Sequence, residues 1–385
     1  MTVIINTNVI LPDGILFDGI IAFDKGRITK ISRSKDFSIQ DGDEIIDANG
    51  LYTAPGLIDI HNHGSRESFF ADAPEECVCH FLKHGETSIL PTFYQTMPLE
   101  EMLSAKEKLQ SFSKKGIGKV IKGIYMEGPY MASGGSNWEQ FKWSGKIDKN
   151  LYKPLVDKTH DFVKVWAVDP ARENIGEFMS YVREVDKDTV FALGHSMATS
   201  EDCEKVAKYG IRLQTHHGDS GMAPRINQAK FGAGCDEYTL CNSDMYAEII
   251  ADEAGIHLAP YSIRTAIKTK GVEKIILITD SYPAEGDYKN NEAEGIKYGS
   301  DLNYDKNGWL AGSHLTLDKA IRNVMSYTGY GLAHAVRFAS LNPAKLLGID
   351  KDYGSLEVGK IADLILVDDK FNVKSVLLEG EKVNL

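Results

Sequence analysis

Cysteine is scarce in this chain of 385 residues. The five cysteines stand at positions 77, 79, 203, 235 and 241, an odd number with irregular spacing. In so long a chain this pattern speaks against a disulfide framework, so we expect five reduced thiols, most of them buried. Cys77 and Cys79 lie in the helical segment APEECVCHFLKHG. Because side chains at i and i+2 diverge around a helix, this pair is not expected to bind a metal ion.

An excess of positive charge is also absent, since the net charge is -12 and the pI is near 5.4. Nucleic acids and anionic membranes need a basic surface, and we therefore expect neither as a partner. A small anionic substrate stays possible, because it needs only a local pocket. No apolar run is long enough for a membrane span, and the start MTVIINTNVILPDG lacks the basic and apolar regions of a signal peptide. The expected compartment is the cytoplasm.

The two ends of the chain share one sequence pattern, short apolar or alternating runs broken by turn residues. The first fifty residues contain VIINTNVI, ILFDGIIAFD, RITKIS and DEIIDA, broken by Asp-Gly, Lys-Gly and Asn-Gly, which is typical of hairpins. The C-terminal runs ADLILVDD and VKSVLLEGEKV repeat this style. We expect residues 1–53 and 355–385 to form one small β-sandwich together.

Between the ends, in residues 54–354, short apolar runs alternate with longer amphipathic stretches. The eight runs are GLIDIH, TSILPTF, IKGIYME, VKVWAVD, TVFALGH, IRLQTH, GIHLAP and KIILITD. Apolar strands with intervening helices predict a parallel sheet covered by helices, and eight repeats close naturally into an α/β barrel of the (β/α)8 type. An open, doubly wound sheet is the competing fold, but it would need a glycine-rich phosphate fingerprint after its first strand, and PGLIDIHNHG is not one.

The segment PGLIDIHNHG ends the first run with two histidines, His61 and His63. In an extended backbone, side chains at i and i+2 point to the same side, so the two imidazoles can converge on one ion. An isolated pair of this kind is more often a pair of surface or core histidines. The metal interpretation therefore needs ligands from elsewhere in the chain.

Other strand ends supply them. Barrel enzymes place catalytic groups where the strands end. Run three ends in Glu127, run five in His195, run six in His216 and run eight in Asp280. With the histidine pair, these residues form a set of imidazoles and carboxylates that suits zinc or ferrous-type ions. The remaining candidates fit less well, because His80 and His84 lie four residues apart on a helical stretch, and His160 and His334 follow no pattern.

Several motifs together resemble one known family. They are PGLIDIHNHG, YMEGPY, ALGHSMAT, QTHH, LITDS, LAGSHLTLDKAI and ASLNPAKLLGIDKDYGSLEVGKIADLILVD. This combination, which covers nearly the whole chain, is similar to the amidohydrolase superfamily and, within it, to the N-acetylglucosamine-6-phosphate deacetylase family. The resemblance implies Glu127, His195 and His216 as ligands of one divalent metal. It also implies His61, His63 and Asp280 as candidates for a second ion, with Asp280 as the general base.

The same resemblance implies the reaction, the cofactor and the assembly. A bound ion lowers the pKa of its water toward ~7 and polarises the amide carbonyl, and the products would be acetate and a free amine. Zinc is the expected metal, with iron, manganese and cobalt as alternatives, and one or two ions are possible because the histidine pair is kept. The substrate would be an amino sugar, and the assembly a homodimer in which His257 reaches the neighbouring subunit's substrate.

The substrate side departs from the family pattern. The family's Leu-aromatic-Asn-Ala-Met run, which holds a sugar phosphate, is replaced here by THHGDSGMAPR, and the family's histidine after EGP is absent. The candidate substrate-binding residues are Asp219, Ser220, Arg225, His257, Leu310, Ala311 and Gly312. Either the phosphate site is rebuilt around Arg225, His257 and backbone amides, or the substrate is another N-acyl compound, unphosphorylated or differently phosphorylated.

Two further alternatives stay open. One is a deaminase or cyclic-amide hydrolase with the same metal chemistry, which the EGP, GHS and LAGS combination disfavours. The other is a metal-free scaffold protein that works by oligomerisation. Such descendants lose ligands, and here all six candidate ligands are present.

Overall fold

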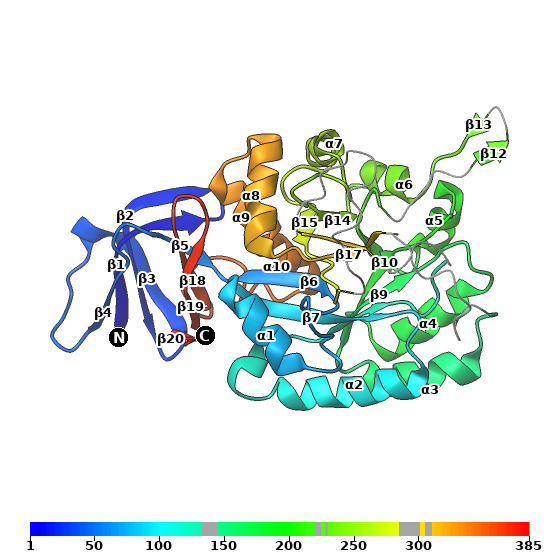
Figure 1. Cartoon of the computed structure of the whole chain (residues 1–385), viewed down its shortest axis with the longest axis horizontal. Helices are drawn as coiled ribbons and strands as arrows, with labels where there is room; N and C mark the ends of the chain where they lie inside the picture. The colour runs from blue at the N-terminus through cyan, green and yellow to red at the C-terminus, as the bar shows by residue number, and fades with distance from the viewer. Residues whose placement is uncertain are drawn as a thin grey trace.

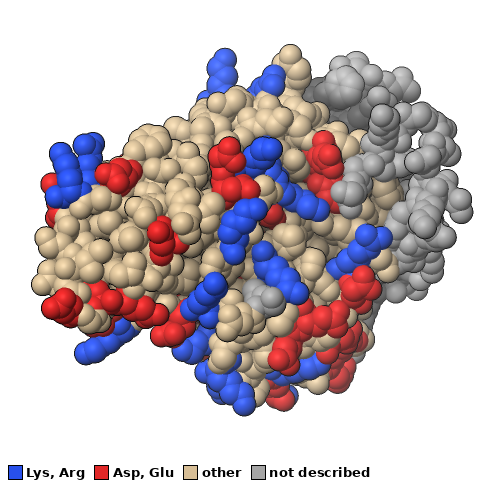
Figure 2. Space-filling view, turned by 60° about the vertical axis from the view of Figure 1, so that its left-hand side comes forward, with Lys and Arg blue, Asp and Glu red and all other residues tan. Residues whose placement is uncertain are grey.

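The computed structural model describes residues 1–132, 143, 145–219, 225–227, 230–284, 301–304 and 310–384. Figure 1 shows two parts, a β-sheet that carries both chain ends and a larger body of strands and helices. Lys and Arg side chains are interspersed with Asp and Glu over the face in Figure 2, so no basic surface stands out there. Among the described residues, no helix is long and apolar enough to cross a membrane.

The larger body is a nearly closed barrel of eight parallel strands with helices between them, which confirms the predicted fold. In sheet order the strands are β6 (Leu57–Asn62), β7 (Glu86–Tyr94), β8 (Ile124–Glu127), β9 (Val163–Val168), β10 (Val190–Leu193), β11 (Ile211–Gln214), β14 (Tyr246–Ile250) and β15 (Ile275–Ile278). A parallel bridge between Asn62 and Ser281 brings the first and last strands together.

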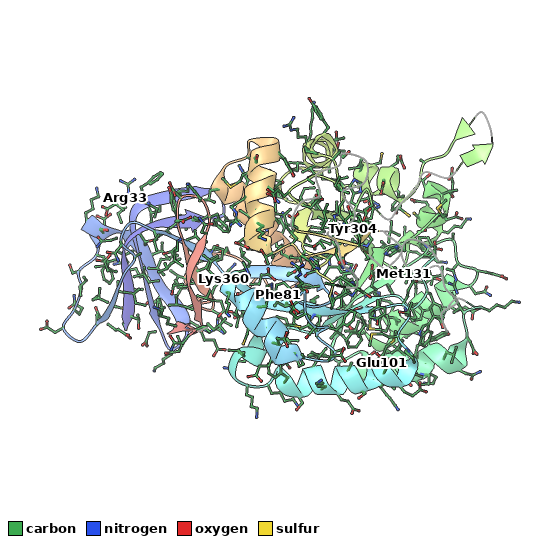
Figure 3. All side chains as sticks on the ribbon, viewed as in Figure 1. Arg33, Phe81, Glu101, Met131, Tyr304 and Lys360 are labelled. Carbon is green, nitrogen blue, oxygen red and sulfur yellow. The ribbon has the colours of Figure 1, made fainter. Side chains whose placement is uncertain are left out.

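Helices follow the strands around the outside of the barrel. They are α1 (Pro74–Lys83), α2 (Leu99–Phe112), α3 (Lys149–Thr159), α4 (Ile175–Val185), α5 (Ser200–Ala207), α6 (Cys235–Cys241), α7 (Pro260–Lys270), α8 (Leu317–Thr328), α9 (Leu332–Phe338) and α10 (Leu341–Leu347), with the 3-10 turn η2 (Gly116–Val120). The helices bury apolar side chains on the barrel side, as in α1, where Phe81 is buried against the barrel core (Figure 3).

One predicted strand is wrong. The run GIHLAP, residues 255–260, forms an irregular loop that leads into α7, and the seventh barrel strand is β14, which ends five residues before this run. The physical reason is the buried carboxylate of Asp252, which accepts hydrogen bonds from the backbone amides of Ala254, Ile256 and His257 and folds this segment into a compact loop. Backbone groups satisfied in this way are not free to join a sheet ladder.

The two chain ends form a separate sheet, as predicted. Its strands run in the order β20 (Glu381–Lys382), β19 (Val373–Leu378), β18 (Leu364–Val367), β5 (Tyr52–Pro55), β1 (Thr2–Leu11), β2 (Gly14–Asp24) and β3 (Arg27–Arg33), and β4 (Glu44–Asp47) also pairs with β1. The sheet has a hydrophobic core of its own, which includes Ile4, Val9, Ile21 and Leu364. The residue boundaries between the two predicted domains stay a prediction.

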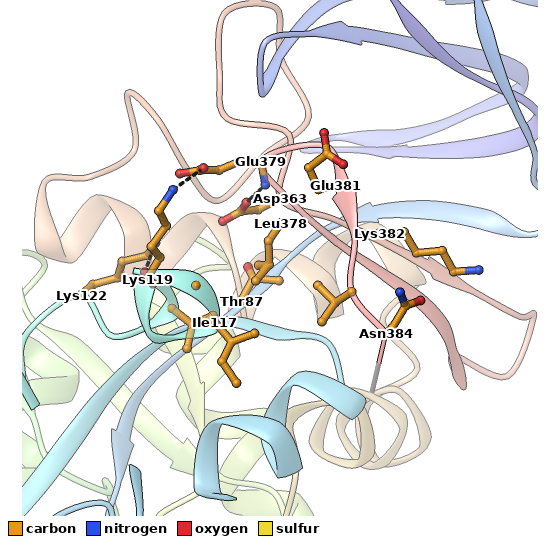
Figure 4. Close-up of a pocket in the computed structure, with 13 residues that line it drawn as sticks. Thr87, Ile117, Lys119, Lys122, Asp363, Leu378, Glu379, Glu381, Lys382 and Asn384 are labelled. Carbon is orange, nitrogen blue, oxygen red and sulfur yellow. Dashed lines mark hydrogen bonds and ion pairs between the residues drawn. The ribbon is translucent and has the colours of Figure 1, made fainter. Parts of the chain in front are cut away.

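A cavity of about 400 Å³ lies where the terminal sheet meets the bottom of the barrel (Figure 4). Its lining carries three lysines and three carboxylates, and Lys119 and Glu379 form an ion pair of 2.6 Å at its edge. Opposite charges of equal number leave no net charge in this cavity. It lies away from the predicted ligands, none of which lines it.

Two short hairpins and the 3-10 turn η1 (Ser34–Asp36) are the other elements of the described residues. The hairpins are β12 (Arg225–Asn227) with β13 (Lys230–Phe231), and β16 (Leu302–Tyr304) with β17 (Leu310–Ser313). The cysteines are free thiols, as predicted: Cys77, Cys203 and Cys235 are buried, Cys79 is half-buried and Cys241 is exposed.

Candidate metal centre

The first barrel strand brings the histidine pair to the centre of the site. His61 and His63 lie at the end of β6, both buried, and their ring centroids are 5.4 Å apart. The Nε2 atom of His61 has no hydrogen-bond partner although it is buried. A buried imidazole nitrogen without a partner costs free energy unless an ion or a proton satisfies it, which fits a metal ligand.

Glu127, the last residue of β8, lies among all four histidines. Its Oε1 atom is 3.0 Å from Nε2 of His195 and 3.2 Å from Nε2 of His216. The same oxygen is 3.7 Å from Nε2 of His61, and Oε2 is 3.2 Å from Nε2 of His63. One carboxylate thus faces two groups of imidazoles, an arrangement that can bridge two ions.

Three further candidates stand two residues past the end of their strands. His195 follows β10, His216 follows β11 and Asp280 follows β15 at this same position. Each has a positive φ, +38° at His195, +23° at His216 and +47° at Asp280. L residues rarely adopt this conformation, and such backbone strain concentrates at functional sites.

The cluster is therefore compact. Two groups of potential ligands have their donor atoms within 4.8 Å of one another, His61 with His63 and Glu127, and Glu127 with His195 and His216. The Oδ1 atom of Asp280 lies 3.5 Å from Nε2 of His61 and 3.2 Å from Nε2 of His63. The structure thus brings together all six residues that the sequence singled out, and nitrogen and carboxylate donors fit a divalent ion.

The charges of the cluster shift its pKa values. Burial raises the pKa of Glu127, but the hydrogen bonds to His195 and His216 and the close contacts of His61 and His63 outweigh this, so its pKa lies well below the usual value. Burial also acts against ionised Asp280, yet the histidines hold its pKa below the usual range. Both carboxylates are therefore ionised at neutral pH, the state in which a carboxylate can bind a divalent ion or accept a proton.

Sequence analysis missed one residue of this region, Glu248 on β14. It is fully buried, its Oε2 atom lies 3.1 Å from Nδ1 of His61, and the same oxygen accepts a hydrogen bond of 3.1 Å from the backbone amide of His216. The available signal was a glutamate inside the apolar run YAEII. A charged residue is almost never buried in a strand without a partner.

The turn after β11 is held by side-chain hydrogen bonds. His217 is buried, and its Nδ1 atom is 2.6 Å from Oε1 of Gln214. Asp236, at the start of α6, accepts hydrogen bonds from the Gln214 amide and from the Gly218 backbone. Asp219 is exposed at the end of this turn. The turn therefore presents the Asp219 carboxylate to the solvent, whereas His217 points inward and stabilises the turn.

His257 is held within its own chain. Its Nδ1 atom lies 3.2 Å from the Asp252 carboxylate, and Nε2 lies 3.2 Å from the backbone oxygen of Gly312. Both ring nitrogens thus have intrachain partners, and the side chain is buried. Leu310 and Ala311 precede Gly312 on β17, and the backbone oxygen of Ala311 accepts a hydrogen bond of 2.8 Å from Asn303.

For two predicted substrate residues, the structure does not describe the side chain. Ser220 lies outside the described residues, and Arg225 is described only by the backbone of β12. Their roles stay a prediction, as do those of the other substrate-side candidates. A group that the sequence did not single out is aromatic: the rings of Tyr94 and Tyr282 lie 6.1 and 5.2 Å from the ring of His63, and Phe69 packs against both.

The chain is similar to known proteins in sequence and in fold. A family model described as "Amidohydrolase family" matches residues 52–383. N-acetylglucosamine-6-phosphate deacetylase of Haemophilus influenzae is 27% identical over 353 residues, 89% of each chain. N-acetylgalactosamine-6-phosphate deacetylase of Escherichia coli O157:H7 is 28% identical over 85% of this chain and 86% of that protein. The crystal structure of the N-acetylglucosamine-6-phosphate deacetylase from Pasteurella multocida superposes with a TM-score of 0.86 at 25% identity, covering 100% of both chains.

A nearly closed barrel with histidines and carboxylates at the C-terminal ends of its strands defines a metal-dependent hydrolase of carbon–nitrogen bonds. The family match extends from the last strand of the first terminal segment through the barrel to the final strands. The chain belongs to the amidohydrolase family.

Proposed function

We propose that this enzyme removes the acetyl group from an N-acetyl amino sugar, N-acetylglucosamine 6-phosphate or a close relative, and releases acetate and the free amine. The observation that carries the proposal is the convergence of four histidines and two carboxylates on one rim of the barrel. The relatives described above, which are named as deacetylases of two amino-sugar phosphates, support the substrate class.

In the proposed site, Glu127, His195 and His216 would hold one divalent ion, which would polarise the amide carbonyl and lower the pKa of water. Asp280 acts as the general base. Its ionised carboxylate takes a proton from the attacking water and then delivers it to the leaving nitrogen, so that the amine departs neutral. His61 and His63 lie 3.5 and 3.2 Å from this carboxylate and orient it.

A second ion would use His61, His63 and Asp280, with Glu127 shared between the two ions. The reason is that Glu127 belongs to both groups of ligands. Zinc is the proposed metal because imidazole and carboxylate ligands suit it, and iron, manganese or cobalt would fit the same donors. Metal analysis of protein purified without chelator gives both the identity and the number of ions. Protein that carries no divalent metal and binds none would favour the scaffold alternative.

The proposal has two forms, which differ in whether the substrate carries a phosphate. The exposed carboxylate of Asp219 would repel a phosphate, and its charge is felt at His216 and His257. A second candidate function is therefore hydrolysis of an N-acyl amino sugar without a phosphate. The first form needs Arg225, His257 or backbone amides to hold the anion. A homodimer is proposed with it from the same family likeness, and the cytoplasmic location from the sequence.

A hydrolysis panel distinguishes the two forms. It compares N-acetylglucosamine 6-phosphate, its galactosamine and mannosamine relatives, and the unphosphorylated sugars. Because a positioned phosphate contact contributes on the order of 2 kcal/mol, the phosphorylated substrates should show kcat/KM at least roughly 30-fold higher if the phosphate is recognised. Equal values would support the unphosphorylated substrate. Metal-loaded enzyme that hydrolyses none of these compounds but deaminates or opens cyclic amides would contradict the proposal.

A further inference from the structure

Glu248 contacts two candidate ligands that come from different strands. It lies in the middle of β14 and is fully buried. Its Oε2 atom lies 3.1 Å from Nδ1 of His61 and 3.1 Å from the backbone nitrogen of His216, whereas Oε1 has no hydrogen-bond partner. Removing a carboxylate from water costs free energy, and more so when one of its oxygens has no hydrogen-bond partner. Such burial needs a gain elsewhere in the site.

The contact with His61 fixes one tautomer of the imidazole. A carboxylate accepts hydrogen bonds only, so the proton stands on Nδ1 and the lone pair on Nε2. Nε2 is the nitrogen that lies near Glu127 and Asp280. The ring is held from its face as well, because Tyr125 stacks on it at 4.5 Å and bonds through its hydroxyl to Thr215 at 2.6 Å.

The contact with His216 fixes a backbone. His216 has φ +23°, and its amide donates to Glu248 Oε2. The next amide, of His217, donates to the backbone oxygen of Glu248 at 2.8 Å. Two consecutive amides are thus tied to one residue of β14. This holds the His216 imidazole, whose Nε2 lies 3.2 Å from Glu127.

We propose that Glu248 is a positioning residue that couples the two groups of metal ligands through a single oxygen atom. It keeps His61 in the tautomer that can bind an ion and holds His216 in its strained conformation. Hydrogen-bonded partners behind metal ligands typically change metal affinity by about 10- to 100-fold when they are replaced. The inference rests on the proposed metal site but not on the identity of the substrate.

The test is zinc binding, measured by competition with a chromophoric chelator, for the wild type, Glu248→Gln and Glu248→Leu. Leucine removes both hydrogen bonds and should weaken zinc binding roughly 10- to 100-fold. Glutamine keeps an oxygen that can accept both bonds, and should restore part of the affinity. Cobalt-loaded protein should show the same order, as a change in its visible absorption spectrum that is larger for leucine than for glutamine.

Glu86 provides the matched control. It is another fully buried glutamate of a barrel strand, and its Oε1 atom accepts a bond of 2.9 Å from the backbone of Leu317, the first residue of α8. Glu86→Leu therefore removes a buried carboxylate without touching a candidate ligand. It should lower the melting temperature yet leave the zinc affinity within about twofold. Glu248→Leu with the affinity of this control would overturn the positioning role.

The outcomes separate this inference from the proposed function. Wild-type protein that binds no zinc contradicts the metal site on which both rest. Wild-type protein that binds zinc but hydrolyses none of the amino sugars contradicts the proposed substrate alone, and the Glu248 comparison still decides. If Glu248→Leu does not fold, Glu248→Gln carries the test, and an affinity equal to the wild type with an unchanged cobalt spectrum would count against the inference.

Discussion

A β-carbon on Gly312 would lie 2.5 Å from the backbone oxygen of Asp280. Gly312 has φ +61°, and the following residue, Ser313, donates its amide to this same oxygen at 2.8 Å. The LAGS motif thus packs its backbone directly against the residue proposed as general base. Close backbone approach is a function that only glycine can serve here.

We expect Gly312→Ala to reduce kcat at least tenfold with a smaller effect on KM, because the displaced backbone moves the Asp280 carboxylate. Overpacking should also cost about 1–3 kcal/mol of stability. Gly331→Ala is the matched control, since a β-carbon at Gly331 meets no atom within 4 Å and its φ is -74°. Kinetics and thermal unfolding of both variants test this. Equal behaviour of the two variants would mean that the approach to Asp280 is unimportant.

Asp280→Asn should bind metal nearly as well as the wild type but lose turnover. The amide keeps the size and one oxygen of the side chain, but it cannot accept a proton from water. General base catalysis typically contributes 10²–10⁴-fold, and we expect a fall in kcat of at least about that size. The measurements are steady-state kinetics and metal content by mass spectrometry. Full activity in this variant would remove Asp280 from the role.

Alanine variants of Glu127, His195 and His216 should fail in a different way. Each removes a donor from the proposed first ion site, so metal content and rate should fall together. His160→Ala is the control, because this histidine caps the end of α3 and belongs to neither ligand group. It should keep the wild-type metal content. Unchanged metal content in the Glu127 variant would contradict the assignment.

The metal-free enzyme should lose stability as the pH rises. Burial lowers the pKa of His216, but the hydrogen bond to Glu127 and the charges of Asp280 and Glu127 outweigh it and raise the pKa from 6.5 to about 9. A group whose pKa is higher in the folded than in the unfolded chain stabilises the folded state most at a pH below its unfolded pKa. This contribution is therefore present below pH 6.5 and disappears as the pH passes about 9.

Melting temperatures of chelator-treated protein between pH 6 and about 9.5 test this expectation. Metal-loaded protein should show the opposite trend, because an ion competes with the proton on His216 and binds more tightly as the pH rises. Glu127→Gln serves as the control for the metal-free series, since it removes the partner that raises the pKa, and the decline should become shallower. If the melting temperature of this variant falls just as steeply with pH, the loss of stability comes from groups other than His216.

Much of the site was readable from the sequence because its geometry follows the backbone. Strand alternation places His61 and His63 on one side, and the barrel repeat brings His195, His216 and Asp280 to the same height. These relations need no knowledge of side-chain packing. They depend only on where strands end.

The seventh strand and Glu248 were not readable in this way. A glutamate in YAEII interrupts the apolar pattern, whereas GIHLAP imitates a strand although Asp252 folds it into a loop. The inward turn of His217 was equally hidden, because Gln214 and Asp236 meet it only in three dimensions. Hydrogen bonds of individual side chains determine these three features, and hydrophobic periodicity cannot predict such bonds.

The left-handed backbone at His195, His216 and Asp280 also bears on how this protein can be altered. Each such residue typically costs on the order of 1–3 kcal/mol, a cost that glycine largely avoids. A screen for heat-resistant variants of the metal-free chain would accordingly enrich glycine at these three positions. The selected variants would be more stable but inactive, because each has lost a residue of the site. Thermal stability alone is therefore a misleading criterion for improving this enzyme.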